Sequence, residues 1–187
     1  MAIDWQAFCE LVALHDRFVL TSHVRPDADA IGSEIGLAEL LEGQGKTVRI
    51  VNPSPITEGL RFLDPDGRVE AIGDDVDVAT ACDADVHVVL DTSAWVQIDG
   101  VGEVLRATTA LKVVIDHHQS SDFLGDLEFK DTSAEATGRL IVDLAEAAGW
   151  ELSAVAADAL FCAIATDTGW FRFSSTNSDT LRAAGRL

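Results

Sequence analysis

Residues 18–33 read Phe-Val-Leu-Thr-Ser-His-Val-Arg-Pro-Asp-Ala-Asp-Ala-Ile-Gly-Ser, a short apolar run followed by a loop dense in titratable side chains. The apolar run predicts a buried strand over Phe18–Thr21, and the loop leads into a helix predicted for Ala30–Glu42. Carboxylates held close together repel each other, so one of them normally stays protonated. A divalent cation removes that repulsion because it supplies positive charge. The stretch therefore predicts a strand that delivers metal ligands at its carboxyl end.

Three further segments of the chain share this pattern of apolar residues followed by metal-ligating side chains. They are two predicted strands, Val86–Leu90 and Lys112–Ile115, and a predicted apolar helix, Ala154–Ala165. The histidines and aspartates that follow the four segments are His23, Asp27, Asp29, Asp91, Asp116, His117, His118 and Asp167. This set is rich in carboxylates and contains no thiolate, which favours Mn²⁺ or Mg²⁺, with Zn²⁺, Co²⁺ or Fe²⁺ as alternatives. It exceeds what one ion needs, so we infer two ions.

Taken singly, most of these residues also have an ordinary structural interpretation. Asp27 and Asp29 suit the cap of the helix that follows them, and Asp116 suits the end of a strand. Asp91 and Asp167 suit turns. All four groups, however, fall at the ends of predicted elements, and that coincidence favours a metal site. Two metals about 4 Å apart are the usual apparatus for attack on phosphorus.

The order of the predicted elements indicates an α/β fold, with a mainly parallel sheet and helices on both faces. The predicted strands are Phe18–Thr21, Thr47–Val51, Val86–Leu90 and Lys112–Ile115, with an edge strand at Trp170–Phe173. The predicted helices are Ile3–His15, Ala30–Glu42, Ala134–Ala148, Ala154–Ala165 and a last helix, capped by Asn177 or Ser178, that runs to Leu187. Pro53–Gly67 reads as a loop with one helical turn. In such sheets, ligands bind beyond the carboxyl ends of the strands, where the charged clusters fall.

The charge of the chain limits its partners. Thirteen basic residues against 32 acidic residues give a net charge of −19. A surface of this kind repels nucleic acid phosphates, so we expect no stable binding to duplex DNA. An anionic substrate needs local positive charge, from metal ions or from a few arginines. The sequence shows no signal peptide and no apolar run long enough to span a membrane, so we expect a cytoplasmic protein.

The four motifs, in this order, resemble those of the DHH phosphoesterase superfamily. They are His23-Val-Arg-Pro-Asp27-Ala-Asp29-Ala-Ile-Gly32-Ser33, then Asp91-Thr-Ser, then Asp116-His117-His118, then Asp167-Thr-Gly169. The flanking stretches, residues 125–134 and 169–173, are similar to the branch that contains bacterial nanoRNases and 3′-phosphoadenosine-5′-phosphate (pAp) phosphatases. The resemblance covers nearly the whole chain.

This resemblance implies a role for each motif residue. The implied ligands are His23 and Asp27 for the first metal, Asp29, His117 and Asp167 for the second, and Asp91 as the bridge between the two. His118 would face the substrate phosphate and Asp116 would orient a ligand imidazole from behind, so both count as catalytic. Arg25 is either a substrate contact or a surface ion pair, and Arg172 is a weaker candidate for the same role.

The activity implied by the resemblance is a manganese-dependent phosphoesterase. It would cleave short oligoribonucleotides or pAp by attack of a hydroxide that two cations activate, with Mg²⁺ or Co²⁺ as alternatives to Mn²⁺. One alternative is hydrolysis of another small phosphate compound, either a cyclic dinucleotide or pyrophosphate. A second alternative is a non-catalytic metal- or nucleotide-binding module.

Members of the superfamily usually carry a second, C-terminal domain that grips the substrate, and the sequence up to Leu187 shows no such region. We therefore expect residues 1–187 to form the catalytic domain, ending near an interdomain linker. Weak activity is expected from this chain alone, because remote binding groups help to position the reacting phosphate. A homodimer, or a partner chain that supplies the second domain, would be compatible with this organisation.

Overall fold

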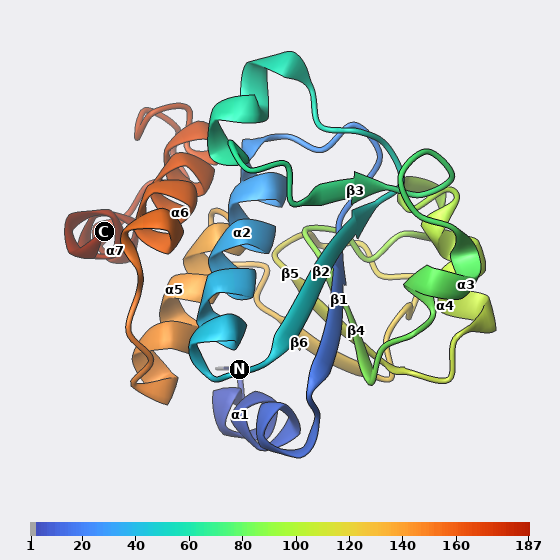
Figure 1. Ribbon diagram of the computed structural model, residues 1–187. Helices are drawn as coiled ribbons and strands as arrows, with labels where there is room; N and C mark the ends of the chain where they lie inside the picture. Colours follow the sequence, from blue (N-terminus) through green and yellow to red (C-terminus); the bar gives the residue numbers. More distant parts are fainter. Residues whose placement is uncertain (1–2) are drawn as a thin grey trace.

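The computed structural model describes residues 3–187, in which six strands form one sheet between two layers of helices (Figure 1). The strands are β1 (Arg17–Thr21), β2 (Thr47–Asn52), β3 (Val69–Ala71), β4 (Val86–Leu90), β5 (Leu111–Asp116) and β6 (Leu127–Lys130). They pair in the order β3-β2-β1-β4-β5-β6, and every pair is parallel. The α/β fold with a mainly parallel sheet is thereby confirmed.

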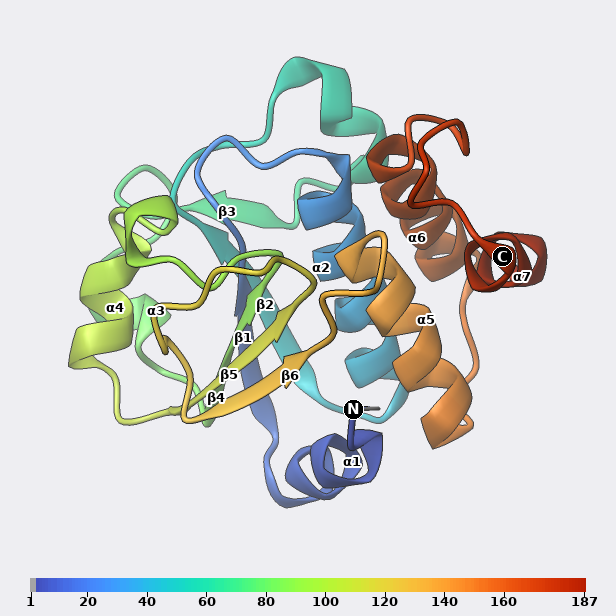
Figure 2. The same ribbon diagram turned by 180° about the vertical axis from the view of Figure 1, so that it is seen from behind.

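Helices cover both faces of the sheet, as the view from behind also shows (Figure 2). One layer contains α1 (Trp5–Leu14), α2 (Ala28–Gly43), α5 (Thr137–Ala148) and α6 (Ala154–Asp167), with α7 (Ser178–Arg186) packed outside α5 and α6. The other layer contains α3 (Val78–Ala81) and α4 (Val101–Ala107). Two short 3₁₀ helices, η1 (Glu58–Leu63) and η2 (Trp95–Gln97), lie in loops. None of the helices within the described residues is both long and apolar enough to cross a membrane.

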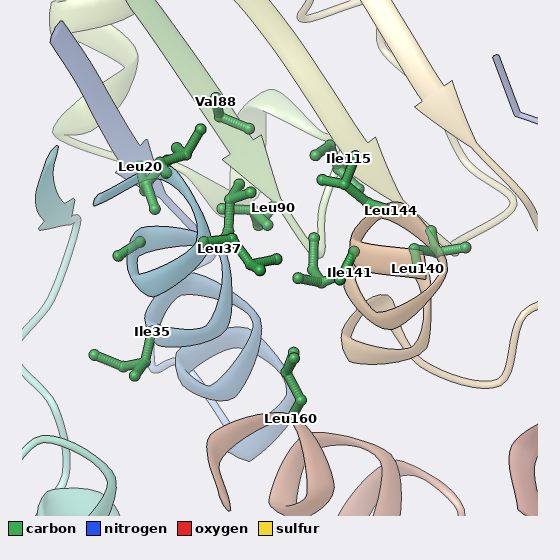
Figure 3. Packing of buried hydrophobic residues seen from close by; sticks show 14 of the residues in the cluster. Leu20, Ile35, Leu37, Val88, Leu90, Ile115, Leu140, Ile141, Leu144 and Leu160 are labelled. Atoms are coloured by element: carbon green, nitrogen blue, oxygen red, sulfur yellow. The ribbon is translucent and has the colours of Figure 1, made fainter. Parts of the chain in front are cut away.

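Alternate residues of the central strands supply two separate cores. Leu20, Val88 and Ile115 point to the larger layer and pack against α2 and α5 (Figure 3). Val89 and Val114, their neighbours in sequence, belong to the second cluster under α3 and α4. Successive side chains of a strand point to opposite faces, so strands buried on both faces need apolar residues throughout. This explains the continuous apolar runs in the sequence.

Glycines allow α2, α5 and α6 to approach closely beside the end of the sheet that carries the charged motifs. A Cβ atom on Gly32 would lie 2.4 Å from the carbonyl oxygen of Ala159 and 2.9 Å from the Cβ of Ala163. A Cβ on Gly138 would lie 2.6 Å from the same Ala163 Cβ. No side chain fits at either glycine unless a helix moves. The close contact brings Asp29 of α2 near Asp167 at the end of α6.

The prediction of an edge strand at Trp170–Phe173 is wrong. These residues form a turn after α6, in which Gly169, Trp170 and Phe171 have φ values of 58°, 58° and 61°. The alternation of aromatic residues matched the period of a strand, but a left-handed backbone does not pair into a sheet. The two edges of the sheet are β3 and β6, which the sequence analysis missed because both are short.

The remaining predicted elements are present with small shifts of their ends. Helix α2 begins at Ala28, two residues before the predicted start, and Asp27 is its N-cap. Helix α5 begins at Thr137, three residues after the predicted start. The loop at Pro53–Gly67 contains η1, and Asn177 caps α7 as predicted. The short helices α3 and α4 were not predicted.

Candidate metal centre

The charged motifs meet at the point where the order of the strands reverses. From β1 the chain proceeds to β2 and β3 on one side, and from β4 it proceeds to β5 and β6 on the other. Loops that leave neighbouring strands in opposite directions open a crevice at the carboxyl ends of those strands. A cleft of about 300 Å³ lies here, and its lining residues are His23, Asp27, Asp91, Thr92, Ala94, Gln97, His118, Ser120 and Asp167.

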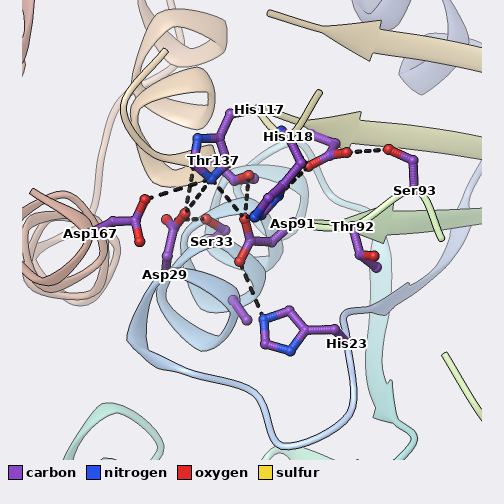
Figure 4. Close-up of polar contacts among 12 residues, drawn as sticks. His23, Asp29, Ser33, Asp91, Thr92, Ser93, His117, His118, Thr137 and Asp167 are labelled. Carbon is purple, nitrogen blue, oxygen red and sulfur yellow. Dashed lines mark hydrogen bonds and ion pairs between the residues drawn. The ribbon is translucent and has the colours of Figure 1, made fainter. Parts of the chain in front are cut away.

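Asp91 lies at the centre of the cluster, directly after β4 (Figure 4). Its Oδ2 is 3.5 Å from Nε2 of His23, and its Oδ1 is 3.5 Å from Nε2 of His117. The hydroxyl of Thr137 donates a hydrogen bond of 2.8 Å to the same Oδ1. The two carboxylate oxygens thus face different histidines, which is the arrangement that a bridging ligand needs.

The first group of candidate ligands consists of His23, Asp27 and Asp91, whose ligand atoms lie within 4.8 Å of one another. His23 Nδ1 is 3.0 Å from the carbonyl oxygen of Val24, so Nδ1 carries the proton and Nε2 faces the carboxylates. Asp27 is 4.0 Å from Nε2 of His23 and also caps α2 by accepting from the amide of Ala30. The ligand interpretation and the helix-cap interpretation of Asp27 are therefore compatible.

His23 shows that this group attracts positive charge. Burial would lower the pKa of His23, but the hydrogen bonds to Asp91 and Val24 and the charges of Asp91 and Asp27 outweigh it and raise the pKa to about 9. In the absence of a metal, a proton on His23 supplies the missing charge. A divalent cation would displace that proton, because metal ligands bind in their deprotonated form.

The second group consists of Asp29, His117 and Asp167. Nε2 of His117 is 3.8 Å from Asp29 Oδ2 and 3.6 Å from Asp167 Oδ2. Nδ1 of His117 is 3.2 Å from the carbonyl oxygen of Ala134 and donates to it, which leaves Nε2 free for a metal. Burial, and then the charge of Asp91, raise the pKa of both Asp29 and Asp167. Carboxylates with raised pKa values fit a site that a cation completes.

Asp29 caps a helix that is distant in sequence. Its two oxygens accept hydrogen bonds of 2.8 Å from the amides of Thr137 and Gly138, the first two residues of α5. The N-cap residue of α5, Ala136, has no side chain that could do this. The positive end of the helix therefore faces the buried carboxylate and fixes its orientation. The sequence suggested Asp29 as a cap of its own helix, not of α5.

Asp116 binds the imidazole of His118, whereas the resemblance implied that it would orient the imidazole of a metal ligand. Its Oδ1 accepts from the amide of His118 at 3.0 Å and lies 2.9 Å from Nδ1 of the same residue. Residues two apart share a face where a strand ends, which places Asp116 and His118 on one side and His117 on the other. Burial of Asp116 opposes ionisation, but hydrogen bonds from His118, Ser93 and Lys130 hold its pKa well below the usual range.

The two candidate arginines lie outside the cleft lining. Arg25 is exposed with a φ of 52°, and its backbone amide donates to Ser54 Oγ at 2.7 Å. No ion pair of Arg25 occurs among residues 3–187, so the surface ion pair has no support there. Arg172 is exposed, and its Nε donates to the carbonyl oxygen of Gly169 at 2.7 Å.

Several residues of the centre were missed in the sequence. Thr137 holds Asp91, while Ser93 and Lys130 hold Asp116. Ser93 follows Asp91 within the second motif, which was the one available signal. Thr137 and Lys130 are brought in by α5 and β6, and no spacing in the sequence indicates those contacts.

An all-parallel α/β sheet with a cluster of histidines and aspartates at its switch point defines an α/β protein with a candidate site for divalent metal ions. The chain belongs to the DHH family, since residues 17–164 match that family's N-terminal domain.

The chain is similar to curated bacterial enzymes and to a solved structure. It is 35% identical to the bifunctional oligoribonuclease and PAP phosphatase NrnA of Bacillus subtilis. The alignment extends over 183 residues and covers 94% of this chain and 54% of that protein. The NrnA of Thermus thermophilus is 33% identical, over 95% of this chain and 51% of that protein. The crystal structure of an exopolyphosphatase-related protein from Bacteroides fragilis superposes with a TM-score of 0.90 at 27% identity, covering 97% of this chain and 54% of that one. The chain thus spans about half the length of the curated relatives that it matches.

Proposed function

We propose that residues 1–187 form the catalytic domain of a metal-dependent phosphoesterase that hydrolyses short oligoribonucleotides or pAp. The observation that carries the proposal is Asp91, whose two oxygens each face a histidine from a different ligand group. Two ligand groups that share one carboxylate are the arrangement used in two-metal hydrolysis of phosphate esters. The relatives NrnA of B. subtilis and T. thermophilus, named for these two activities, support the substrate class.

The donors of the centre fit two divalent cations, and we propose Mn²⁺. The ligand atoms are carboxylate oxygens and imidazole Nε2 atoms whose Nδ1 partners are backbone carbonyls. Manganese accepts both kinds of ligand, whereas magnesium prefers oxygen ligands and retains its waters. When bound, the two ions lower the pKa of a water and neutralise the phosphoryl oxygens. His23 and Asp27 would hold one ion, Asp29, His117 and Asp167 would hold the other, and Asp91 would join them.

We assign the substrate side of the cleft to His118. Asp116 binds its Nδ1, which leaves Nε2 as the group that meets the substrate. Hydrogen bonding to Asp116 raises the pKa of His118, despite partial burial, so the ring readily carries a proton toward a phosphate or a leaving oxygen. Arg25, exposed on the loop between His23 and Asp27, would contact the substrate from outside the cleft.

The size and charge of the cleft favour small substrates. About 300 Å³ is enough for a terminal nucleotide and not for a duplex. The net charge of −19 also disfavours long nucleic acids, because only 13 basic residues stand against 32 acidic residues. The curated relatives are about twice as long as this chain, and remote binding groups help to position a reacting phosphate, so we propose that this domain alone acts weakly.

The test is hydrolysis of pAp and of 5′-labelled RNA of two to five nucleotides by the purified chain. We expect release of AMP from pAp, and of mononucleotides from RNA, with Mn²⁺ and not with EDTA. Bis-4-nitrophenyl phosphate serves as a non-nucleotide control ester. A chain that binds Mn²⁺ but cleaves none of these compounds would instead act as a non-catalytic binding module, and the proposed function would be wrong.

A further inference from the structure

Lys130 is a partly buried cation beside Asp116 and has no role in the function proposed so far. It ends β6, and its side chain is only 14% exposed. Its ammonium lies 2.9 Å from Asp116 Oδ2 and also contacts Ser93 Oγ and the carbonyl oxygen of Ser120. An ammonium has three N–H donors, and all three therefore have partners. An ammonium with three partners is held in one position.

The two oxygens of Asp116 contact different sets of partners. Oδ1 accepts from the amide and from Nδ1 of His118, at 3.0 Å and 2.9 Å. Oδ2 accepts from Ser93 Oγ and from the Lys130 ammonium. Asp116 itself is fully buried, so the carboxylate needs every one of these donors. Lys130 and Ser93 hold one oxygen in place and thereby direct the other toward His118.

This arrangement determines which nitrogen of His118 carries a proton. An ionised carboxylate only accepts hydrogen bonds, so Nδ1 beside Asp116 Oδ1 must be the donor. The other nitrogen, Nε2, then serves the cleft that His118 lines. Without Lys130, Oδ2 would lose its charged partner, and rotation of the Asp116 carboxylate would release the His118 ring.

We propose that Lys130 is a positioning residue, which acts through Asp116 to fix the ring orientation and the protonated nitrogen of His118. The inference rests on the proposed function, in which His118 meets the substrate phosphate. A competing explanation is that Lys130 only neutralises a buried aspartate and contributes to stability. The two explanations differ in what happens to His118 when Lys130 is replaced.

The first arm of the test is kinetic and uses Lys130→Met, which keeps the length of the side chain and removes its charge. We expect kcat for pAp to fall by roughly tenfold to hundredfold, because a catalytic group displaced by about 1 Å loses that much. Mn²⁺ binding by calorimetry should keep its stoichiometry, since Lys130 contacts no candidate ligand. In a His118→Ala background the same substitution should cause no further loss. Lys112→Met is the matched control, because Lys112 lies near the start of β5 and Asp116 lies at its end. This variant should change kcat less than about twofold.

The second arm needs no activity and reads the His118 ring by ¹⁵N NMR with Mg²⁺ present. The chain has five histidines, so His118→Ala identifies the signal of this ring. At a pH at which the His118 ring is neutral, we expect it to be protonated at Nδ1 in the unaltered chain, and to be a mixture of the two tautomers after Lys130→Met. If the chain cleaves neither pAp nor RNA, the proposed function fails, while this spectrum still decides the role of Lys130.

An unchanged His118 spectrum, or a wild-type kcat in folded Lys130→Met, would overturn the inference. Should Lys130→Met fail to fold, Ser93→Ala provides a second variant, because it removes the other donor to Asp116 Oδ2. We expect a smaller change of the same kind in kcat and in the His118 spectrum. Ser93→Ala with both readings unchanged would contradict the proposal equally.

Discussion

Asp91 occupies the left-handed region of the backbone, with a φ of 59°, directly after β4. Aspartate adopts this conformation more readily than most residues, but the conformation still costs free energy. The strained backbone turns the carboxylate into the cleft, between His23 and His117. Strain at a buried carboxylate, kept by the hydrogen bond from Thr137, is typical of a functional residue.

The first prediction concerns Asp91→Ala. Because one carboxylate serves both ligand groups, we expect kcat to fall at least about hundredfold and both Mn²⁺ affinities to weaken together. Calorimetric titration with Mn²⁺ and pAp kinetics measure the two effects. Asp66→Ala, on an exposed loop, is the control and should leave both unchanged. Full activity in Asp91→Ala would show that the two groups do not work as one centre.

Glu34 provides a second prediction at this scale. It is fully buried under the first motif, where its Oε2 accepts from Asn52 Nδ2 at 2.9 Å and Asn52 accepts from the amide of Ser22 at 2.9 Å. Burial raises the pKa of Glu34 from 4.5 to about 8, in spite of the hydrogen bonds from Asn52 and Ser22. The folded protein therefore binds more protons than the unfolded chain between these values, so its free energy of unfolding falls as the pH rises.

Glu34→Gln should remove this part of the pH dependence. Urea unfolding of the metal-free protein at about pH 5, 6.5 and 8 should show a shallower decline of stability in the variant. His23 contributes a decline of the same sign between 6.5 and about 9, so the variant curve is not expected to be flat. The exposed Glu151→Gln is the control, with a slope like that of the unaltered chain. Parallel curves for Glu34→Gln would mean that Glu34 is ionised in the folded state.

At the scale of elements, the sequence predicted what is local and missed what depends on tertiary contacts. The central strands and the ligands that follow them were found, because each ligand lies next to an apolar run in the chain. The partner of Asp29, the amides of α5, comes from residues more than a hundred positions away. Trp170–Phe173 was misassigned because its aromatic residues alternate as in a strand. The backbone instead forms a turn, in which Gly169, Trp170 and Phe171 have left-handed φ values. The edge strand β6 buries little more than Phe129, so it carried a weak signal.

The close packing of α2 on α6 leads to the third prediction. Gly32→Ala would place a methyl group 2.4 Å from the backbone oxygen of Ala159. We expect the free energy of unfolding to drop by about 1–3 kcal/mol, because overpacking forces the helices apart. Gly43→Ala, at the open end of the same helix, meets nothing within 4 Å and should be neutral or stabilising by up to about 1 kcal/mol. Urea denaturation measures both, and equal effects in the two variants would argue against a tight contact between α2 and α6.

At the scale of the whole molecule, the strand order and the negative charge both concentrate at the carboxyl ends of the central strands. The reversal of strand order opens the crevice, and Asp27, Asp29, Asp91 and Asp167 come together beside it from loops and from the ends of α2 and α6. Four carboxylates and a net charge of −19 would make this end of the sheet repel itself and any phosphate. Divalent cations change the sign of the local charge. Metal binding should therefore stabilise the fold as well as recruit the substrate.

The last prediction is a metal-dependent rise in thermal stability. A ligand present at about a hundred times its Kd stabilises a protein by about 2.7 kcal/mol per site, which for a domain of this size raises Tm by roughly 5–10 °C. We expect this rise with Mn²⁺, a reversal by EDTA, and a larger shift at about pH 8 than at about pH 6, because protons compete with the metal for His23. Differential scanning calorimetry measures each of these. Asp91→Ala should show little of the shift, since the loss of the shared carboxylate weakens both ligand groups. If Mn²⁺ left Tm unchanged at both pH values, the cluster of histidines and aspartates would bind no metal, and protons alone would balance its negative charge.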